Sequence, residues 1–414
     1  MKNKTGCNDI KFEVLIIGTD ANAYYMARCY HEAYNKKAYV LGRNQMSFTK
    51  YSNIVNVNYN DKIWEENEFI KALNNFKRII PKNTKILVIS SNETYTNFLN
   101  KNRDNLDKQF IFNYNNPLLI ESLIMKDKFY KTYENSNLTF AKTCFYDCKE
   151  YKEFNEKILY PVIVKPSDVI TYNHNDFDGK KKVYRLNTKE EVNDTIKKIV
   201  ESVYKSTLII QEYIPGDDSY LFDAVAYSGK DKKVKLISFA QIGLQEHTEN
   251  MIGNAAVLIN GYSQYPGVNK MIDIIKTFLE EISYEGFCEF DMKYDYRDNT
   301  YKVLEINARQ GRSSYYITEA GYNLIKVMVD DLIYDKKMEF NVIDKKILLS
   351  FIPKGVILKY CKNEKFKNKV LELWKYRVNP LKYNKDKNMM RVVFLIKKYL
   401  RYYKEYENST WEND

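Results

Sequence analysis

Two stretches of alternating polar and apolar residues, joined by a short polar link, restrict the fold of this chain more than any other feature. The first reads Phe287-Cys-Glu-Phe-Asp-Met-Lys-Tyr-Asp295, and the second reads Tyr301-Lys-Val-Leu-Glu-Ile-Asn-Ala-Arg309. Alternation with a period of two is typical of strands that bury one face. The link, residues 296–300, suits a hairpin turn. The sequence therefore predicts an antiparallel hairpin in this region.

The expected register of this hairpin brings acidic side chains together. A turn centred near Asp298 puts Asp291 across from Glu305 and Glu289 across from Asn307. Like charges directly opposite each other are destabilising, and a divalent cation that prefers oxygen ligands offsets that repulsion. The alternative is an ordinary polar face in contact with solvent. Three apolar residues are expected on the opposite face, in a core: Phe290, Leu304 and Ile306.

Two arginines follow the second strand, in the run Arg309-Gln-Gly-Arg312. A guanidinium group binds phosphate or carboxylate through paired hydrogen bonds. Arginines beside a carboxylate cluster therefore favour a metal site that handles phosphate, or a substrate carboxylate, over a solvated polar face.

The composition is that of a globular protein with two or three domains. The chain has 414 residues, of which 44% are hydrophobic and 29% are charged. No apolar run reaches the roughly 18–20 residues of a membrane span, and the first residues lack the apolar core of a signal peptide. Six scattered cysteines and three histidines favour an oxygen-ligated metal over zinc. We therefore expect a cytoplasmic protein.

The positive charge is concentrated in the last part of the chain. Residues 354–414 contain 16 Lys and Arg against 7 Asp and Glu, so they carry nine of the eleven net positive charges. Residues 390–404 combine apolar and basic side chains with helical character. Such a stretch can lie on an anionic membrane surface or hold an anionic substrate, or it can be a packed terminal helix with a solvated basic face. Nucleic acid is not expected, because no recognised binding motif accompanies the charge.

The first part of the chain predicts a parallel α/β domain. Residues 11–18, 38–41 and 85–90 have the character of buried strands, and a helix is expected over 23–34. The first turn, Gly18-Thr-Asp-Ala-Asn22, does not match the glycine pattern of a dinucleotide site. Its Asp20 and Asn22 lie where such sheets bind ligands, but helix capping is the simpler role.

A second block begins near residue 117 and predicts an α+β domain. A buried strand over 158–166 contains Lys165, and a polar loop with three consecutive lysines, 167–182, follows it. A strand then ends in the Pro-Gly turn at 215–216, and another leads to the polar loop 245–249. Lysines beside a glycine-containing loop suit phosphates, although a solvated hairpin tip has the same composition.

Four of these pieces, taken in order, resemble the ATP-grasp ligases. They are the lysine-containing run Lys126-Asp-Lys-Phe, the strand Pro-Val-Ile-Val-Lys-Pro, the hinge Ile-Gln-Glu-Tyr-Ile-Pro-Gly, and the hairpin end Glu-Ile-Asn-Ala-Arg. The resemblance runs from about residue 11 to 335. It implies an N-terminal α/β domain over 1–116, an ATP-grasp domain over 117–335 that holds a nucleotide between two α+β subdomains, and a basic C-terminal extension over 336–414.

Further segments look similar to one branch of this family, the D-aspartate ligases of bacterial cell-wall synthesis. They include 177–184, Glu246-His-Thr with Ile252-Gly-Asn, 291–295, and Phe351-Ile-Pro-Lys-Gly-Val. The resemblance implies an enzyme that uses ATP and Mg²⁺ to convert the carboxylate of an amino acid into an acyl phosphate. The amino acid that the resemblance favours is D-aspartate. The amine that attacks would be a lysine side chain in the stem peptide of an anionic peptidoglycan precursor.

The sequence is also compatible with other functions. The same chemistry can join glycine, another small amino acid or another amine. A kinase on the same architecture would release ADP without forming an amide. A nucleotide-binding protein recruited to membranes by its basic tail is a third class.

The resemblance also assigns nucleotide contacts. Lys128 and Lys165 match the lysines at the phosphates and purine edge, and Lys182 matches the basic end of the flexible phosphate loop. Asp218 matches the acid that binds ribose, with Asp217 as a close rival. The hinge that reads adenine corresponds to Gln211, Glu212 and Ile214.

The metal and catalytic positions follow in the same way. Three residues match the magnesium ligands, with Glu289 behind them or competing for the first position: Asp291, Glu305 and Asn307. Arg309 and Arg312 match the arginines that stabilise the acyl phosphate. His247 falls in a loop on the substrate side, with a role that the resemblance leaves open. No residue identifies itself as the base that deprotonates the amine.

Overall fold

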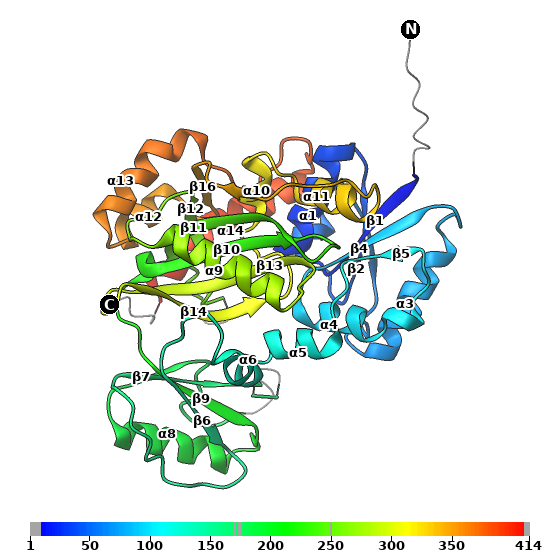
Figure 1. Cartoon of the computed structure of the whole chain (residues 1–414). Coiled ribbons are helices and arrows are strands. Elements are labelled where there is room, and N and C mark those ends of the chain that lie inside the picture. Colours follow the sequence, from blue (N-terminus) through cyan, green and yellow to red (C-terminus); the bar gives the residue numbers. More distant parts are fainter. Residues whose placement is uncertain (1–9, 169–170, 173–175, 249–250, 410–414) are drawn as a thin grey trace.

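The computed structural model describes residues 10–168, 171–172, 176–248 and 251–409. Three sheets organise this part of the chain, as Figure 1 shows: a parallel sheet, a small antiparallel sheet in a lobe of its own, and a large, mostly antiparallel sheet that lies beside the first and above the lobe. The expected order of a parallel α/β domain followed by an α+β fold is confirmed.

The N-terminal sheet is parallel and has the strand order β3-β2-β1-β4-β5. Its strands are β1 (Phe12–Ile17), β2 (Ala38–Gly42), β3 (Val55–Tyr59), β4 (Lys85–Ser90) and β5 (Phe110–Ile111). The helices of this domain are α1 (Ala21–Tyr34), α2 (Ser47–Lys50), α3 (Glu66–Arg78) and α4 (Glu93–Lys101), followed by the 3₁₀ turn η1 (Arg103–Asn105). Strand β3, which the sequence analysis missed, lies at the sheet edge and is mostly open to solvent. Its sequence, Val-Asn-Val-Asn-Tyr, alternates apolar and polar residues, so the pattern could have predicted this strand.

The small sheet has the order β6-β9-β7-β8, with antiparallel pairs throughout. Its strands are β6 (Thr143–Asp147), β7 (Val162–Pro166), β8 (Tyr184–Leu186) and β9 (Thr207–Glu212). Helix α8 (Lys189–Glu201) buries its apolar side against this sheet. Two helices, α5 (Pro117–Ile124) and α6 (Lys126–Tyr133), lead into the lobe. Within the expected phosphate loop, residues 169–170 and 173–175 lie outside the described residues.

The large sheet has the order β14-β13-β10-β11-β12-β16, and β15 pairs with β11 in parallel. Its strands are β10 (Leu221–Ser228), β11 (Val234–Gln245), β12 (Ala255–Asn260), β13 (Gly286–Asp295), β14 (Thr300–Asn307), β15 (Asn341–Ile343) and β16 (Ile347–Ser350). The associated helices are η2 (Asp218–Tyr220), α9 (Val268–Glu281), α10 (Tyr315–Glu319) and α11 (Leu324–Leu332). Helices α10 and α11 pack against α1, which joins this sheet to the N-terminal domain.

Strands β13 and β14 form the expected hairpin. Asp291 pairs with Glu305 and Glu289 pairs with Asn307, so the predicted register is confirmed. Leu304 is an exception, because it does not enter the core with Phe290 and Ile306. The register shifts beside Asp291, and this β-bulge leaves Leu304 without a pairing partner. The side chain is half-buried and lines a cavity.

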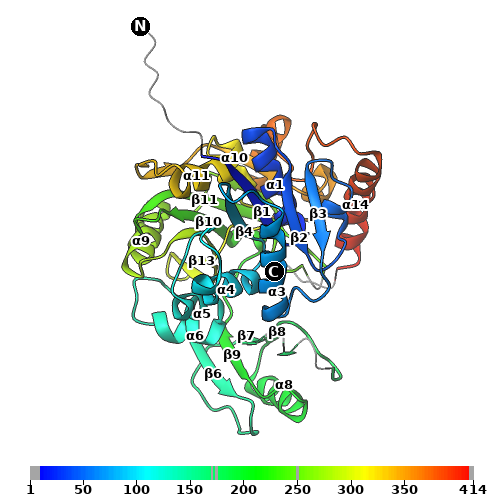
Figure 2. The same ribbon diagram turned by 90° about the vertical axis from the view of Figure 1, so that its right-hand side faces the viewer.

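The C-terminal segment is built into the fold. Strands β15 and β16 lie beyond the expected boundary at 336, yet both belong to the large sheet. The remaining elements are α12 (Lys354–Tyr360), α13 (Glu364–Leu373), the 3₁₀ turn η3 (Trp374–Tyr376) and α14 (Met389–Glu407). Figure 2 shows α14 on the side of the N-terminal domain that carries β2 and β3, and it contacts α2 and α12.

A buried arginine fixes α14 to the N-terminal domain. Arg391 donates to the carbonyl oxygens of Phe48 at 2.6 Å and Leu381 at 2.9 Å. Its Nε is 3.1 Å from Asp386, and its guanidinium lies 3.5 Å from the centre of the Tyr24 ring. The structure therefore shows the basic segment as a packed helix. In the described part of the chain, no helix has the length and apolarity to span a membrane.

Replacing this arginine should destabilise the whole protein. The change Arg391→Met leaves the buried carboxylate of Asp386 without its counter-ion, so we expect the free energy of unfolding to fall by about 3 kcal/mol. Urea denaturation followed by circular dichroism measures this loss. Lys404→Met is the matched control, because the exposed Lys404 lies on the same helix and its replacement should change stability by less than about 0.5 kcal/mol. Equal midpoints for the two variants would contradict the packing role of α14.

Candidate functional site

Three adjoining cavities lie around the β13–β14 hairpin. The first has a volume of about 270 Å³, the second about 130 Å³ and the third about 720 Å³. Lys182, Asp291 and Glu305 line both the first and the second cavity. Arg309 and Arg312 line both the second and the third. The cavities therefore form one continuous site.

The first cavity lies between the small sheet and the large sheet. Four of the predicted nucleotide-binding residues line it: Gln211, Glu212, Ile214 and Asp218. Apolar side chains cover much of its wall: Ile163, Leu221, Phe222, Ile242, Met292 and Leu304. Asp218 accepts hydrogen bonds from the backbone and side chain of Gln245 at 2.9 and 2.6 Å. Its rival Asp217 instead caps η2 by accepting from Ser219. The wall suits a flat ring with a polar group at its edge.

Three lysines form the charged end of this cavity: Lys126, Lys165 and Lys182. Burial, with Lys165 and Lys182 nearby, lowers the pKa of Lys126 to about 7. Burial lowers the pKa of Lys165 to about 8, and it also lowers that of Lys182. Because crowded cations are disfavoured without anions, a ligand with several negative charges would stabilise this cluster.

Lys128, which the resemblance assigned to this end, is not in the cavity. It forms an ion pair with Glu121 at 2.5 Å, and its side chain is 46% exposed. Residues two apart on a helix point about 200° away from each other, so only one of the two lysines at the start of α6 can face the site. The structure gives that position to Lys126, which contacts Glu305. Both lysines lie in the run Lys126-Asp-Lys-Phe, and spacing alone did not show which of them would face the cavity.

The second cavity contains a cluster of buried carboxyl groups. Asn307 donates to Glu289 at 3.1 Å and to Asp291 at 3.0 Å. Asp223 on β10 lies directly across from Asp291 on β13, and the sequence analysis missed it. Burial, together with Glu289, raises the pKa of Asp291 to about 8. Burial and mutual repulsion likewise raise the pKa values of Asp223 and Glu289.

This donor set fits a hard divalent cation. Several carboxyl groups are buried together here, and carboxylate and amide oxygens are the ligands that Mg²⁺ prefers. No group of three or more His, Cys, Asp or Glu side chains within the described ranges is already arranged around a metal position. Asn307 falls outside such a group, and Glu305 is held by Lys126. A cation that arrives with nucleotide phosphates needs fewer protein ligands, so the residues fit that case.

Arg309 and Arg312 separate the second cavity from the third. Arg309 is 2.7 Å from Glu93 and 3.5 Å from Glu289. Burial alone would lower its pKa, but these carboxylates hold it above its ordinary value. Arg312 is 2.5 Å from Glu246. Within the described structure, Nε of Arg309 and both Nε and Nη1 of Arg312 are buried without a hydrogen-bond partner. These N–H groups are suited to an anion.

Gly311, between the two arginines, is required by a close approach. A Cβ atom there would lie 1.4 Å from Oε1 of Glu289. Only glycine therefore lets the loop after β14 pass the carboxylate cluster.

His247 lies behind the wall of the site. Its ring stacks on Tyr406 with centroids 4.1 Å apart, and its Nε2 is 3.8 Å from Asp218. It is not among the described residues that line the three cavities. The neighbouring residue Glu246 does line the third cavity, and Tyr402 donates to it at 3.0 Å.

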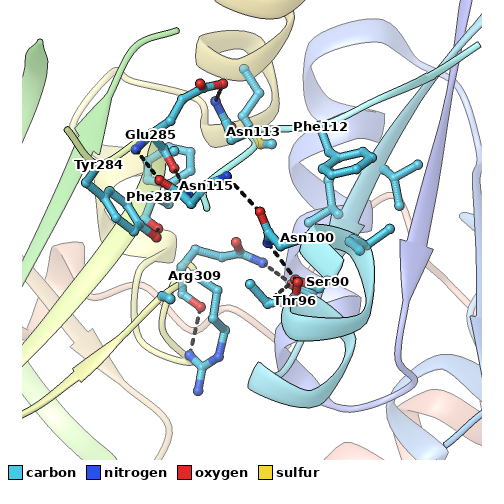
Figure 3. Close-up of a pocket in the computed structure, with 17 residues that line it drawn as sticks. Ser90, Thr96, Asn100, Phe112, Asn113, Asn115, Tyr284, Glu285, Phe287 and Arg309 are labelled. Carbon is cyan, nitrogen blue, oxygen red and sulfur yellow. Dashed lines mark hydrogen bonds between the residues drawn. The ribbon is translucent and has the colours of Figure 1, made fainter. Parts of the chain in front are cut away.

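A small polar cavity of about 50 Å³ lies behind Arg309, between the N-terminal domain and the large sheet. Figure 3 shows its hydrogen bonds. The Asn100 side chain accepts from the backbone N–H of Asn115 at 2.7 Å. The Asn115 side chain exchanges two bonds with the backbone of Glu285, at 2.8 and 2.9 Å. Gln310 donates to the carbonyl of Ser90 at 2.9 Å. These bonds fix the loop that carries the two arginines against β4 and α4.

The third cavity brings together parts of the chain that the sequence analysis did not connect. Its wall combines the start of α1, the loop after β2, the loop after β11, and helix α14. Asp20 caps α1 by accepting from Ala23 at 2.9 Å, as expected, and it also lines this cavity.

Comparisons with known proteins agree with this geometry. Residues 126–330 match the family model "Carbamoyl-phosphate synthase L chain, ATP binding domain". The chain is 33% identical over 404 residues to the D-aspartate ligase of Enterococcus faecium, which covers 94% of each chain.

Two solved structures share the fold. N5-carboxyaminoimidazole synthetase from Staphylococcus aureus, complexed with ADP, matches with a TM-score of 0.60 and 17% identity over 88% of each chain. The L-amino acid ligase from Bacillus licheniformis matches with a TM-score of 0.55 and 16% identity, over 78% of this chain and 74% of that chain.

These similarities extend over the N-terminal domain and the C-terminal segment as well as the matched ATP-binding domain, and they fit a nucleotide-sized cavity that ends in three lysines. The chain belongs to the ATP-grasp family of ATP-dependent carboxylate–amine ligases, to which D-aspartate ligase also belongs.

Proposed function

We propose that this protein activates the carboxylate of D-aspartate with ATP as an acyl phosphate and joins it to an amine. The amine is the lysine side chain in the stem peptide of a peptidoglycan precursor. The observation that carries the proposal is the identity to D-aspartate ligase over 94% of both chains. Identity limited to the ATP-binding domain would support only a nucleotide site.

The first cavity is proposed to bind ATP. Adenine lies in the apolar slot beside Ile214, and Asp218 accepts hydrogen bonds from ribose. The phosphates extend toward Lys126, Lys165 and Lys182, where burial lowers the pKa values and an anion would stabilise the charged forms. The γ-phosphate then points into the second cavity, where the carboxyl groups and arginines lie.

The second cavity is proposed to hold the reacting groups. Two anions repel each other when a carboxylate approaches a phosphate, so the site must supply positive charge. Arg309 and Arg312 direct buried, unpartnered N–H groups to this region and would bind the acyl phosphate. Mg²⁺, held by Asp291, Glu305 and Asn307 with Glu289 behind them, would neutralise phosphate charge when nucleotide is bound.

The proposed reaction belongs in the cytoplasm. All five cysteines within the described ranges are free, as expected in a reducing compartment.

The two lysines at the start of α6 test the nucleotide assignment. Lys126→Ala removes a charged contact to phosphate, so we expect KM for ATP to rise roughly 10- to 100-fold. Lys128→Ala is the matched control, because it removes only a surface ion pair and should change KM by less than about threefold. Steady-state ADP release measures both values. A larger effect from Lys128→Ala would restore the assignment made by resemblance.

The metal assignment depends on Glu305. We expect Glu305→Ala to lower kcat by at least about 100-fold, because the variant loses a ligand of the Mg²⁺ that would neutralise the phosphate charge. The midpoint of thermal unfolding should stay near that of the parent. Asp298→Ala is the control, because it removes an exposed carboxylate from the turn of the same hairpin. Near-normal ADP release by the Glu305 variant would mean that the metal binds elsewhere.

The substrates are tested by ADP release with magnesium when D-aspartate, L-aspartate and glycine are each offered. The amine is a UDP-linked pentapeptide that contains lysine, and product mass is recorded. We expect turnover and a mass increase of one aspartyl residue with D-aspartate only. An adduct with glycine would keep the ligase and replace the amino acid, whereas ADP release without any adduct would point to another amine or to a kinase.

A further inference from the structure

The third cavity has the size and position of a second substrate site. Its volume of about 720 Å³ lies within the range of sites for sizeable ligands. It meets the second cavity at Arg309 and Arg312, where the acyl phosphate of the proposed reaction would form. An amine that enters from this side reaches the acyl phosphate without passing the nucleotide.

Helix α14 gives this cavity a basic wall. Lys397, Lys398 and Arg401 line it, one turn of helix apart or less. No ion pair joins Lys397 or Lys398 to a carboxylate in the part of the chain that the structure describes. Nζ of Lys398 instead lies 4.8 Å from the ring centre of Tyr402 and 5.7 Å from that of Phe48. Burial lowers the pKa of Lys398, so an anion beside it would stabilise the charged form.

The wall also contains acidic groups, but most of these are already paired. Glu405 is 2.7 Å from Arg401, so it partly neutralises that side chain. Glu246 is held by Arg312 and Tyr402. The remaining carboxyl group is that of Asp20.

Asp20, in the N-terminal domain, also lines the cavity. Burial raises the pKa of Asp20, although the nearby Arg309 and Arg312 act to lower it. This carboxyl group therefore lies close to the arginines that mark the reacting end of the site. It accepts from Ala23 through Oδ1, and a carboxylate has further acceptor positions for an ammonium group.

We propose that the third cavity binds the amine substrate as an extended ligand with opposite charges. Lys397, Lys398 and Arg401 bind phosphate groups that the substrate carries, and Asp20 receives its ammonium group. This inference rests on the proposed ligase function. It adds the binding site of the amine substrate and the residues that select an amine substrate with phosphate groups.

The burial of Lys398 favours a ligand in the cavity over a membrane surface. A helix that lies on anionic lipid presents apolar and basic residues toward the same surface. The exposed side chains of α14 include Met389, Ile396, Leu400 and also Lys397. Lys398 is instead half-buried and lines the cavity, near the rings of Tyr402 and Phe48.

The test compares two amines, the UDP-linked pentapeptide and the same pentapeptide without its nucleotide. The double variant Lys397→Gln with Lys398→Gln should raise KM for the UDP-linked form by about tenfold or more. The KM of the free pentapeptide should change less than that, and kcat should be affected less than KM. Pyrophosphate should compete with the UDP-linked form in the parent protein and less well in the double variant. Lys404→Gln, which removes a charge from α14 away from the cavity, is the matched control.

A second variant tests the opposite end of the ligand. Asp20→Asn keeps a good helix cap but loses the negative charge. We expect it to raise KM for both amines by a similar factor. An unchanged KM for both would overturn the role of Asp20.

Other results would overturn the lysine assignment. An equal rise in KM for both amines in the double variant would show a structural effect only. A loss of binding to phosphatidylcholine–phosphatidylglycerol vesicles, with no change in either KM, would assign the lysines to a membrane.

Failure of the proposed function gives a different pattern. In that case the parent protein ligates neither amine, and binding of UDP by calorimetry becomes the readout. Loss of UDP binding in the double variant, but not in Lys404→Gln, would support the anion site, and equal binding by all three proteins would overturn it.

Discussion

The arrangement of the site follows from a cluster of like charges in the interior of the large sheet. Asp223, Glu289 and Asp291 lie on the neighbouring strands β10 and β13, where burial and mutual repulsion raise their pKa values. A core does not tolerate such a cluster unless cations and donors surround it. Arg309 and Asn307 supply part of that compensation. The remainder has to come from what the site binds, so the same repulsion that makes the empty site unfavourable favours its ligands.

Local patterns in the sequence were sufficient where a single element determines the outcome. The alternation along the β13–β14 hairpin, with its short turn, gave the pairing of Asp291 with Glu305. The parallel N-terminal domain and the hinge residues that line the first cavity followed from strand patterns and family resemblance. The pattern failed at Leu304, because a bulge interrupts the period of two and turns that side chain toward the cavity. The resemblance assigned Lys128 to the phosphates, whereas the structure places Lys126 in the cavity, because two lysines so close together on α6 point to different sides of the helix.

The remainder could not be predicted because it depends on contacts between distant segments. Asp223 looks like an ordinary polar residue of a strand until β10 pairs with β13. The acid of Asp20 and the lysines of α14 are nearly four hundred residues apart, yet they line one cavity. The basic composition of the C-terminal segment could be read from the sequence. Its packing through Arg391 could not, because no local pattern indicates which distant carbonyl oxygens accept hydrogen bonds from that arginine. A single sequence shows which side chains each helix or strand carries, and tertiary packing determines which of these side chains come into contact.

The position of α14 also has a consequence for folding during synthesis. A ribosome makes the nucleotide-binding sheets before it makes residues 389–407. Until those residues emerge and Arg391 reaches Phe48 and Leu381, the third cavity lacks one of its walls. A nascent or prematurely terminated chain can thus contain every group that handles ATP while having no enclosed place for the second reactant.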